Sequence, residues 1–151
     1  MKILRGEKLY MSQIFTAVGR AVPVTVVKAS TDLTSGSEVE AVTVTSFQTG
    51  ERVAVRGVSK GKGFQGVVKR HGFHGGPRTH GQKHSEREPG SIGGGLRTRV
   101  PKGMRMAGRM GGRRVTVKSL EVVHIDEHKQ ELFLKGALPG RRGTKLEIWK
   151  R

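Results

Sequence analysis

The glycines and lysines of residues 61–66 form the first segment whose residue types and spacing could carry chemistry. They match the G-x-G-x-x-G pattern that holds the pyrophosphate of a dinucleotide, and Glu86 lies where a ribose-binding acid could follow. That chemistry requires a helix that opens at the third glycine, and residues 67–72 are too short and too β-branched to predict one. We therefore expect the glycines to supply backbone freedom, so that main-chain N–H groups and neighbouring lysines can approach phosphates closely.

Four histidines follow this segment and could suggest a metal site: His71, His74, His80 and His84. Zinc sites usually combine short fixed spacings with thiolate or carboxylate ligands on a firm scaffold. These histidines lie in a glycine-rich run, and the chain contains no cysteine. We expect no metal and no other cofactor, and we interpret the histidines as partners for phosphate, ribose or exposed bases.

Candidate catalytic groups are few in the same region. Glu86 and Glu88 flank Arg87, an arrangement that favours charge balance over acid–base catalysis. Ser91 does not lie in a G-x-S-x-G nucleophile elbow, and no partner acid is evident. The sequence therefore predicts that the protein is not an enzyme and acts on no small-molecule substrate.

A series of basic residues follows, interrupted by glycines and by three methionines. Its members are Arg97, Arg99, Lys102, Arg105, Arg109, Arg113 and Arg114. Residues 59–114 as a whole hold 14 Lys/Arg, 2 Asp/Glu and 15 Gly, whereas the other 95 residues hold 15 Lys/Arg and 10 Asp/Glu. A segment of this composition cannot bury enough apolar surface to fold alone, so we expect a polyanion, most simply RNA, to order it.

The flanking sequence predicts a mainly β protein that would position this segment. Short β-branched or alternating runs, separated by turn residues, predict strands at 22–27, 39–45, 52–55, 115–125, 131–135 and 146–148. We expect a turn at 48–50, a bulge near Ser119 and a final edge strand, and no window shows a helical period. The predicted fold is a small closed antiparallel β-barrel, formed by residues 1–58 and 115–151, with residues 59–114 inserted as a long basic extended loop.

Several other classes of protein are disfavoured by the composition. The absence of cysteine leaves no disulfide framework, and no apolar run has the length of a membrane span or of a signal peptide. The basic region is too rich in glycine for an amphipathic helix at a membrane surface. We expect a cytoplasmic protein with no membrane partner.

The same residues resemble the ribosomal protein L3 family. Residues 58–70 (VSKGKGFQGVVKR) are similar to the signature of that family, and further similar segments follow in family order at 79–81, 89–93, 106–111, 115–117 and 135–140. Residues 11–15 are similar to a motif near the family's start, with Tyr10 where glycine is usual. The resemblance covers nearly the whole chain.

The resemblance implies a structural protein of the large ribosomal subunit that binds large-subunit rRNA and neighbouring ribosomal proteins. It implies a closed β-barrel of the translation-protein type, an early role in ribosome assembly, and a long loop that reaches toward the peptidyl transferase centre. An organellar ribosome stays open beside a cytoplasmic one. The alternative is a free-standing basic nucleic-acid-binding protein, which would bind generic duplex DNA comparably well.

Two sets of site residues follow from the residue types and this resemblance. The expected rRNA-binding residues are Lys60, Lys62, Lys69, Arg70, His71, His74, Arg78, His80, Lys83, Arg97, Arg99, Lys102, Arg105, Arg109, Arg113 and Arg114. The expected loop tip near the peptidyl transferase centre consists of Pro89, Gly90, Ser91, Ile92, Gly93 and Gly94.

The chain also departs from the family pattern in two places. Residues 30–46 stand where the family usually has several dozen residues more, which predicts a shortened outer part of the barrel. Gly94 stands where some members carry a methylated glutamine, so we expect that modification to be absent.

Overall fold

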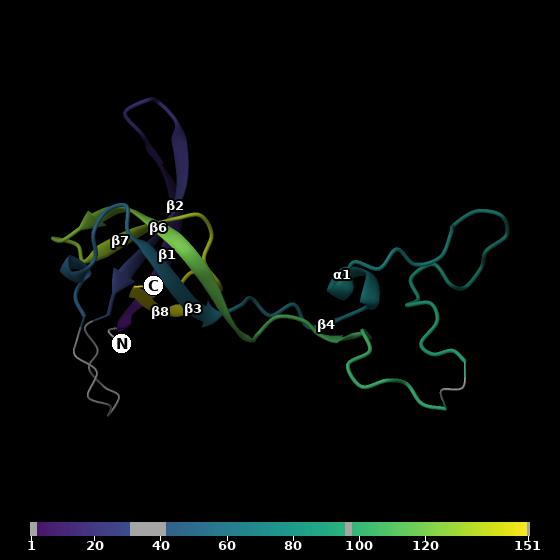
Figure 1. Cartoon of the computed structure of the whole chain (residues 1–151). Coiled ribbons are helices and arrows are strands. Elements are labelled where there is room, and N and C mark those ends of the chain that lie inside the picture. Colours follow the sequence, from purple (N-terminus) through teal and green to yellow (C-terminus); the bar gives the residue numbers. More distant parts are fainter. Residues whose placement is uncertain (1–2, 31–41, 96–97, 151) are drawn as a thin grey trace. The chain divides into compact units, whose positions relative to one another are not determined.

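The computed structural model describes residues 3–30, 42–95 and 98–150 of the chain. It divides into two compact units, one formed by residues 1–60 and 113–151 and the other by residues 61–112. The predicted insertion, residues 59–114, is two residues longer at each end than the second unit. We refer to these as the sheet unit and the glycine-rich unit, and Figure 1 labels their elements.

Six antiparallel strands build the sheet unit. They are β1 (Ile3–Phe15), β2 (Ala21–Ala29), β3 (Arg52–Val58), β6 (Arg114–Asp126), β7 (Glu131–Lys135) and β8 (Lys145–Lys150). Their order is β1-β2-β7-β6-β3-β8, and β8 pairs again with β1, so that the sheet closes. The prediction of a mainly β, antiparallel fold is confirmed.

The interior of the closed sheet is filled by aliphatic side chains from every strand. One side chain from each strand, at most 2% exposed, illustrates this: Leu4, Val27, Val55, Val122, Leu134 and Ile148. Burial of such side chains is the main source of stability in a small domain, at about 1.5–3 kcal/mol each. The predicted β-branched and alternating runs therefore form strands because one face of each can be buried here.

Several local predictions are confirmed by the strand register. Near Ser119, the pairing of β6 with β3 shifts by one residue, and Ser119 itself has φ +59°, as a bulge requires. The predicted turn at 48–50 is present, with the Glu51 N–H donating to the Gln48 carbonyl and Gly50 at φ +86°. Residues 127–130 connect β6 to β7 as an antiparallel hairpin.

Other strand predictions were wrong. The alternation at 39–45 predicted a strand, but residues 44–46 form the 3-10 helix η1 (Val44–Ser46), and residues 39–41 lie outside the described part of the chain. Val44 and Phe47 are instead buried in the core, so the same apolar pattern serves a helical turn. The final strand is not at an edge, because β8 pairs with both β1 and β3.

No apolar pattern in the sequence predicted β1, the thirteen-residue first strand. Its inward positions are occupied by Leu4, Gly6 and Lys8, which do not form an apolar series. Gly6 is needed because a Cβ there would come within 2.7 Å of Val27 Cγ1. Lys8 is 8% exposed, and its Nζ donates to the carbonyls of Leu138 (2.8 Å) and Gly140 (3.1 Å), which attaches the loop before β8 to the sheet.

The glycine-rich unit has a small scaffold of its own. Strands β4 (Phe64–Gln65) and β5 (Gly108–Arg109) pair as a two-stranded sheet, and the helix α1 (Val67–His71) follows β4 directly. The expectation of a helix-free extended loop was therefore wrong at residues 67–71, although a helix of five residues is still too short for a dinucleotide-binding unit. No helix in the described residues is long and apolar enough to cross a membrane.

Candidate nucleic-acid interface

Two side chains of α1 hold the glycine-rich unit together. The Arg70 guanidinium donates to the Met106 carbonyl, and His71 Nε2 lies 3.1 Å from the same oxygen. Val67, on the same helix, is 4% exposed. Arg70 and His71, which were predicted to bind RNA, thus also make a contact within the unit, between segments far apart in the sequence.

Backbone hydrogen bonds continue this scaffold beside α1. The Lys62 N–H donates to the Met110 carbonyl and the Met110 N–H donates to the Gly63 carbonyl, both at 2.9 Å. Gly63 has φ +69°, a conformation that glycine adopts at little cost. Lys62 thus lies in a backbone segment held by hydrogen bonds just before β4, and its side chain is exposed.

A second close contact between two backbone segments, 75–76 and 85–86, lies further along the glycine-rich unit. The Gly76 N–H donates to the carbonyls of Ser85 (3.0 Å) and Glu86 (3.2 Å). Gly75 has φ +74°, and a Cβ there would come within 1.9 Å of the Glu86 carbonyl oxygen, so only glycine allows this approach. Arg78 Nε donates to Glu86 Oε1 at 2.6 Å, which confirms charge balance as one use of that carboxylate.

Most of the cations that were predicted to bind rRNA have exposed side chains. Exposed in the glycine-rich unit are Lys62, Lys69, His74, Arg78, His80, Lys83, Arg99, Lys102, Arg105 and Arg109, and exposed in the sheet unit are Lys60, Arg113 and Arg114. Arg97 lies outside the described residues. The positive charge is therefore exposed to solvent. Few other side chains lie between the cations along the backbone, which suits contact with phosphates.

The predicted tip, residues 89–94, is exposed at every position. Its one hydrogen bond within the described side chains runs from Ser91 Oγ to the Gly93 carbonyl at 2.6 Å. Gly90 has φ +79°, and Ile92 is 42% exposed without a covering core. This arrangement leaves the tip free to contact a partner.

The four histidines are not assembled into a metal site. Among the residues that the structure describes, no group of three or more His, Asp or Glu side chains could hold a metal ion. The His71 ring lies 5.9 Å from the Phe73 ring, whereas His74, His80 and His84 are exposed.

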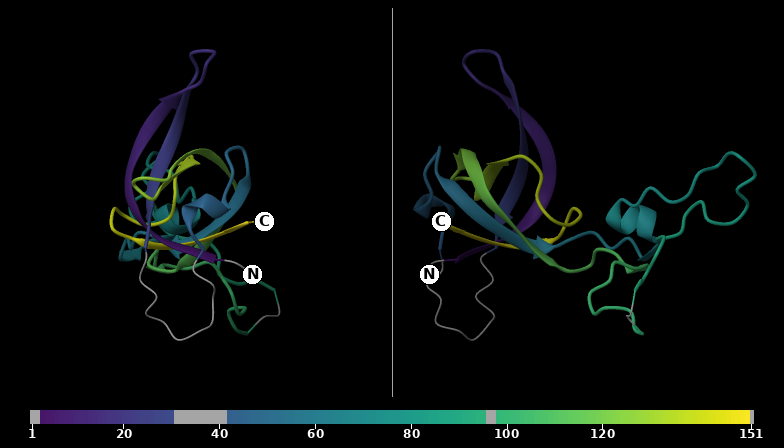
Figure 2. Two further views of the ribbon diagram at one scale, coloured as in Figure 1. Left: turned by 90° about the vertical axis from the view of Figure 1, so that its left-hand side faces the viewer. Right: turned by 45° about the vertical axis from the view of Figure 1, so that its right-hand side comes forward.

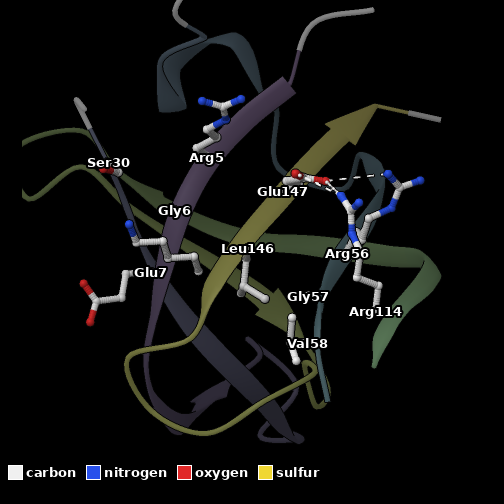
Figure 3. A pocket seen from close by; sticks show the side chains of 11 residues that line it. Arg5, Gly6, Glu7, Ser30, Arg56, Gly57, Val58, Arg114, Leu146 and Glu147 are labelled. Atoms are coloured by element: carbon white, nitrogen blue, oxygen red, sulfur yellow. Dashed lines mark hydrogen bonds and ion pairs between the residues drawn. The ribbon is translucent and has the colours of Figure 1, made fainter. Parts of the chain in front are cut away.

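A basic hollow on the sheet unit was missed by the sequence interpretation. It has a volume of about 430 Å³ and is lined by residues of β1, β3, β6 and β8 together with Ser30 (Figure 3). Glu147 pairs with Arg5 across one strand boundary and with Arg56 across the other, and its carboxylate lies 3.7 Å from Arg56 and 3.3 Å from Arg114. Only the register brings these residues together, because Arg5 lies 142 positions and Arg56 lies 91 positions from Glu147 in the sequence.

Cations outnumber acids around this hollow. Arg5, Arg56, Arg114 and Lys145 line it together with Glu7 and Glu147. The Arg56 guanidinium also lies 5.1 Å from the centre of the Trp149 ring, which fixes its position by a cation–π contact. The hollow could thus accept a phosphate beside a preorganised guanidinium.

Comparison with known proteins decides the family. The model of the ribosomal protein L3 family matches residues 19–141. The chain belongs to this family. The large ribosomal subunit protein uL3 of Herpetosiphon aurantiacus is 40% identical over 191 aligned positions, which cover 91% of this chain and 90% of that protein. The resemblance inferred from the sequence motifs is confirmed.

Two further relatives agree with this assignment. The uL3 protein of Acidothermus cellulolyticus is 38% identical, with 95% of this chain and 89% of that protein covered. The uL3c protein of Guillardia theta is 45% identical over 106 positions, with 70% and 52% covered. Members of this family are structural components of the ribosome and not enzymes.

The alignments also bear on the predicted shortening. The alignment with the Herpetosiphon protein has 191 positions, whereas the chain has 151 residues, so part of that relative lies opposite gaps in this chain. The shorter length is consistent with the expectation from the family pattern. Most of the segment to which the deletion was assigned, residues 31–41, lies outside the described residues.

Proposed function

We propose that this protein is a structural constituent of the large ribosomal subunit that binds large-subunit rRNA through its glycine-rich unit. Membership of the L3 family carries the proposal, since the matched relatives are named as large-subunit proteins. The exposed cations support rRNA as the ligand, because a chain of net charge +17 concentrates most of its excess positive charge in residues 59–114.

The two units have different roles in this proposal. The sheet unit is a closed barrel of the translation-protein type that docks on the rRNA surface and contacts neighbouring ribosomal proteins. The glycine-rich unit is a long loop that reaches toward the peptidyl transferase centre, with residues 89–94 at its tip. The protein joins the subunit early in assembly, since its loop must be surrounded by RNA that folds later.

Arg70 and His71 act indirectly in this interaction. Their contacts with the Met106 carbonyl hold α1 against the return strand of the unit. The exposed cations on either side, such as Lys69 and Arg105, then meet phosphates directly.

The first test is sedimentation of a cell lysate through a sucrose gradient, with detection of this chain in every fraction. We expect stoichiometric presence in the large subunit, retained through a moderate salt wash. A chain that remains at the top of the gradient would contradict the ribosomal role while leaving the family assignment intact.

The second test measures the contribution of cations in the glycine-rich unit. Replacing Arg99, Lys102 and Arg105 together by glutamine should lower the slope of log affinity against log salt by about 2–3, because each neutralised phosphate contributes about 0.7–0.9. The matched control replaces Lys28, Lys129 and Arg141, three exposed cations of the sheet unit, by glutamine. An equal loss of slope in both triple variants would show that the glycine-rich unit has no special role.

The third test concerns the proposed tip. Gly93→Glu places a carboxylate in an exposed segment with no neighbour within 4 Å, so the folded protein should tolerate it. We expect slower assembly or an altered response to drugs of the peptidyl transferase centre, through repulsion between the carboxylate and RNA. Gly93→Ala is the control, and equal behaviour of the two variants would place the tip elsewhere.

A further inference from the structure

The ribbon formed by the ends of β1 and β2 differs from the rest of this basic chain. Arg20 is the only charged residue between Leu9 and Val27. The ribbon extends from the closed part of the sheet (Figure 2), because β8 pairs with β1 only at Ile3–Glu7 and β7 pairs with β2 only from Val24 onward. With Arg20 as its one cation, this surface offers little to a polyanion.

Large apolar side chains are exposed on the same ribbon. Tyr10 is 47% exposed, Met11 52%, Phe15 64% and Val18 93%. Met11 and Phe15 share one face of β1, since they are separated by an even number of residues, and Ala21 and Pro23 lie on the same face of β2 through the register. Exposed apolar residues that gather in this way indicate a protein interface.

The backbone of β1 is also open along this ribbon. The Thr16 N–H donates to the Arg20 carbonyl at 2.9 Å, so alternate residues of β1, namely 12, 14 and 16, point toward β2. The N–H and C=O groups of Met11, Gln13 and Phe15 therefore point away from β2. Within the described part of the chain no third strand pairs with them, because the β1–β8 ladder ends before this point.

The opposite edge of the ribbon is closed to strand addition. Pro23 has no N–H, and its carbonyl accepts from the Gly136 N–H at 2.9 Å. Exposed strand edges are sites where an extended segment can add as a further strand. Only the β1 edge of this ribbon meets that condition, and it lies beside the exposed side chains of Met11 and Phe15.

We propose that the β1 edge of the ribbon, residues 11–15, binds an extended, uncharged and largely apolar segment of a neighbouring protein as an added β-strand. The backbone groups of Met11, Gln13 and Phe15 supply the ladder, and the Met11 and Phe15 side chains supply the apolar contact. Because Arg20 is its only charged residue, the ribbon attracts RNA and acidic segments less than the basic remainder of the chain does. This inference rests on the proposed function, which places the neighbour within the ribosomal particle.

The test uses a photoreactive benzoylphenylalanine in place of Phe15, in the full chain within assembled particles. We expect a crosslink to a protein, and we expect the crosslinked peptide to be an uncharged apolar segment. The matched probe replaces Phe64, which is 76% exposed in the glycine-rich unit, and we expect it to crosslink to rRNA. A crosslink from position 15 to rRNA, to a charged peptide or to a second copy of this chain would overturn the inference.

Failure of the proposed function is distinguishable in the same experiment. If the chain does not enter particles, or position 64 crosslinks to no RNA, the ribosomal proposal fails. If position 64 crosslinks to rRNA while position 15 crosslinks to no protein, the inference about the ribbon alone is wrong.

A backbone variant separates strand addition from contact by side chains alone. Gln13→Pro removes one outward N–H and no bond to β2, so we expect the crosslink yield from position 15 to fall by about fivefold or more. Gln13→Thr keeps that N–H and should leave the yield unchanged. An unchanged yield in Gln13→Pro would show that no strand is added at this edge.

Discussion

The sheet unit and the glycine-rich unit differ in what holds them together. In the sheet unit, twelve buried side chains form one apolar cluster, ten from the six strands and η1 and two, Phe47 and Leu138, from the connecting segments. In the glycine-rich unit, Val67 (4% exposed) is the only buried residue among those described, and backbone hydrogen bonds, Arg70 and close glycine contacts supply the rest. One unit is therefore stabilised by its own core, whereas the other buries too little apolar surface to be stabilised in that way.

Hydrogen exchange in the free protein should show the largest difference between the units. The Val122 N–H, bonded to the Glu51 carbonyl at 2.9 Å, should exchange only through global unfolding. The Gly76 N–H should exchange orders of magnitude faster, because few buried contacts oppose local opening. Addition of rRNA should protect the Gly76 amide. Equal protection of both amides without RNA would remove the distinction between the units.

Truncation of one apolar side chain in each unit should give the next largest effect. Leu134→Ala removes a fully buried side chain of β7 and should lower the free energy of unfolding by about 2–5 kcal/mol. Phe64→Ala removes an exposed side chain of β4 and should change it by about 0.5 kcal/mol or less. Urea denaturation of the two variants measures both values, and similar losses would contradict a core confined to the sheet unit.

A smaller effect is expected from Lys8, the buried cation of the sheet unit. Lys8→Met leaves the carbonyls of Leu138 and Gly140 without their donor, which should cost about 1–3 kcal/mol. Burial, together with the charge of Lys60, lowers the pKa of Lys8 below 10.5. The unfolded chain therefore binds the proton more tightly, and stability should rise with pH between the lowered pKa and 10.5.

The pH dependence gives the control for this prediction. In Lys8→Met, the rise in unfolding free energy over that window should be smaller than in the natural chain, as measured by denaturation at several pH values. The same rise in both proteins would assign the dependence to other groups.

The smallest effect is expected at an exposed ion pair of the sheet unit. Lys135 Nζ donates to Glu121 Oε2 at 2.8 Å, and this hydrogen bond lowers the pKa of Glu121 below 4.5. The pair should contribute stability above pH 4.5 that is lost as the pH falls through the lowered pKa. Because both side chains are about half exposed, Glu121→Gln should cost about 1 kcal/mol or less near pH 7 and nothing in acid.

Part of the fold could be predicted because some patterns act locally. β-Branched residues at 22–27 and 115–125 predicted strands that the structure contains, and Ser119 interrupts the alternation where the bulge lies. The pattern at 39–45 misled because Val44 is buried from a 3-10 turn, and periodicity does not separate that case from a strand. β1 gave no pattern because glycine and lysine occupy its inward positions.

For the candidate site too, residue type indicated some features, whereas others arise only from tertiary contacts. Residue type alone identified the cations, most of which are exposed, but it gave no indication that Arg70 and His71 also make contacts within the unit. Arg70 and His71 make these contacts because the chain folds back and places the Met106 carbonyl beside α1. The hollow around Glu147 was missed because Arg5 and Arg56 become neighbours of that carboxylate only through two strand ladders.

The sequence by itself determined the family, the β class and the concentration of positive charge, since each depends on local order and composition. The tertiary structure decided which strands are neighbours, which cations serve the unit internally, and which strand edge stays open at residues 11–15. The physical reason is the same for all three, because pairing, burial and exposure arise between residues far apart in the chain. No spacing along the sequence encodes them directly.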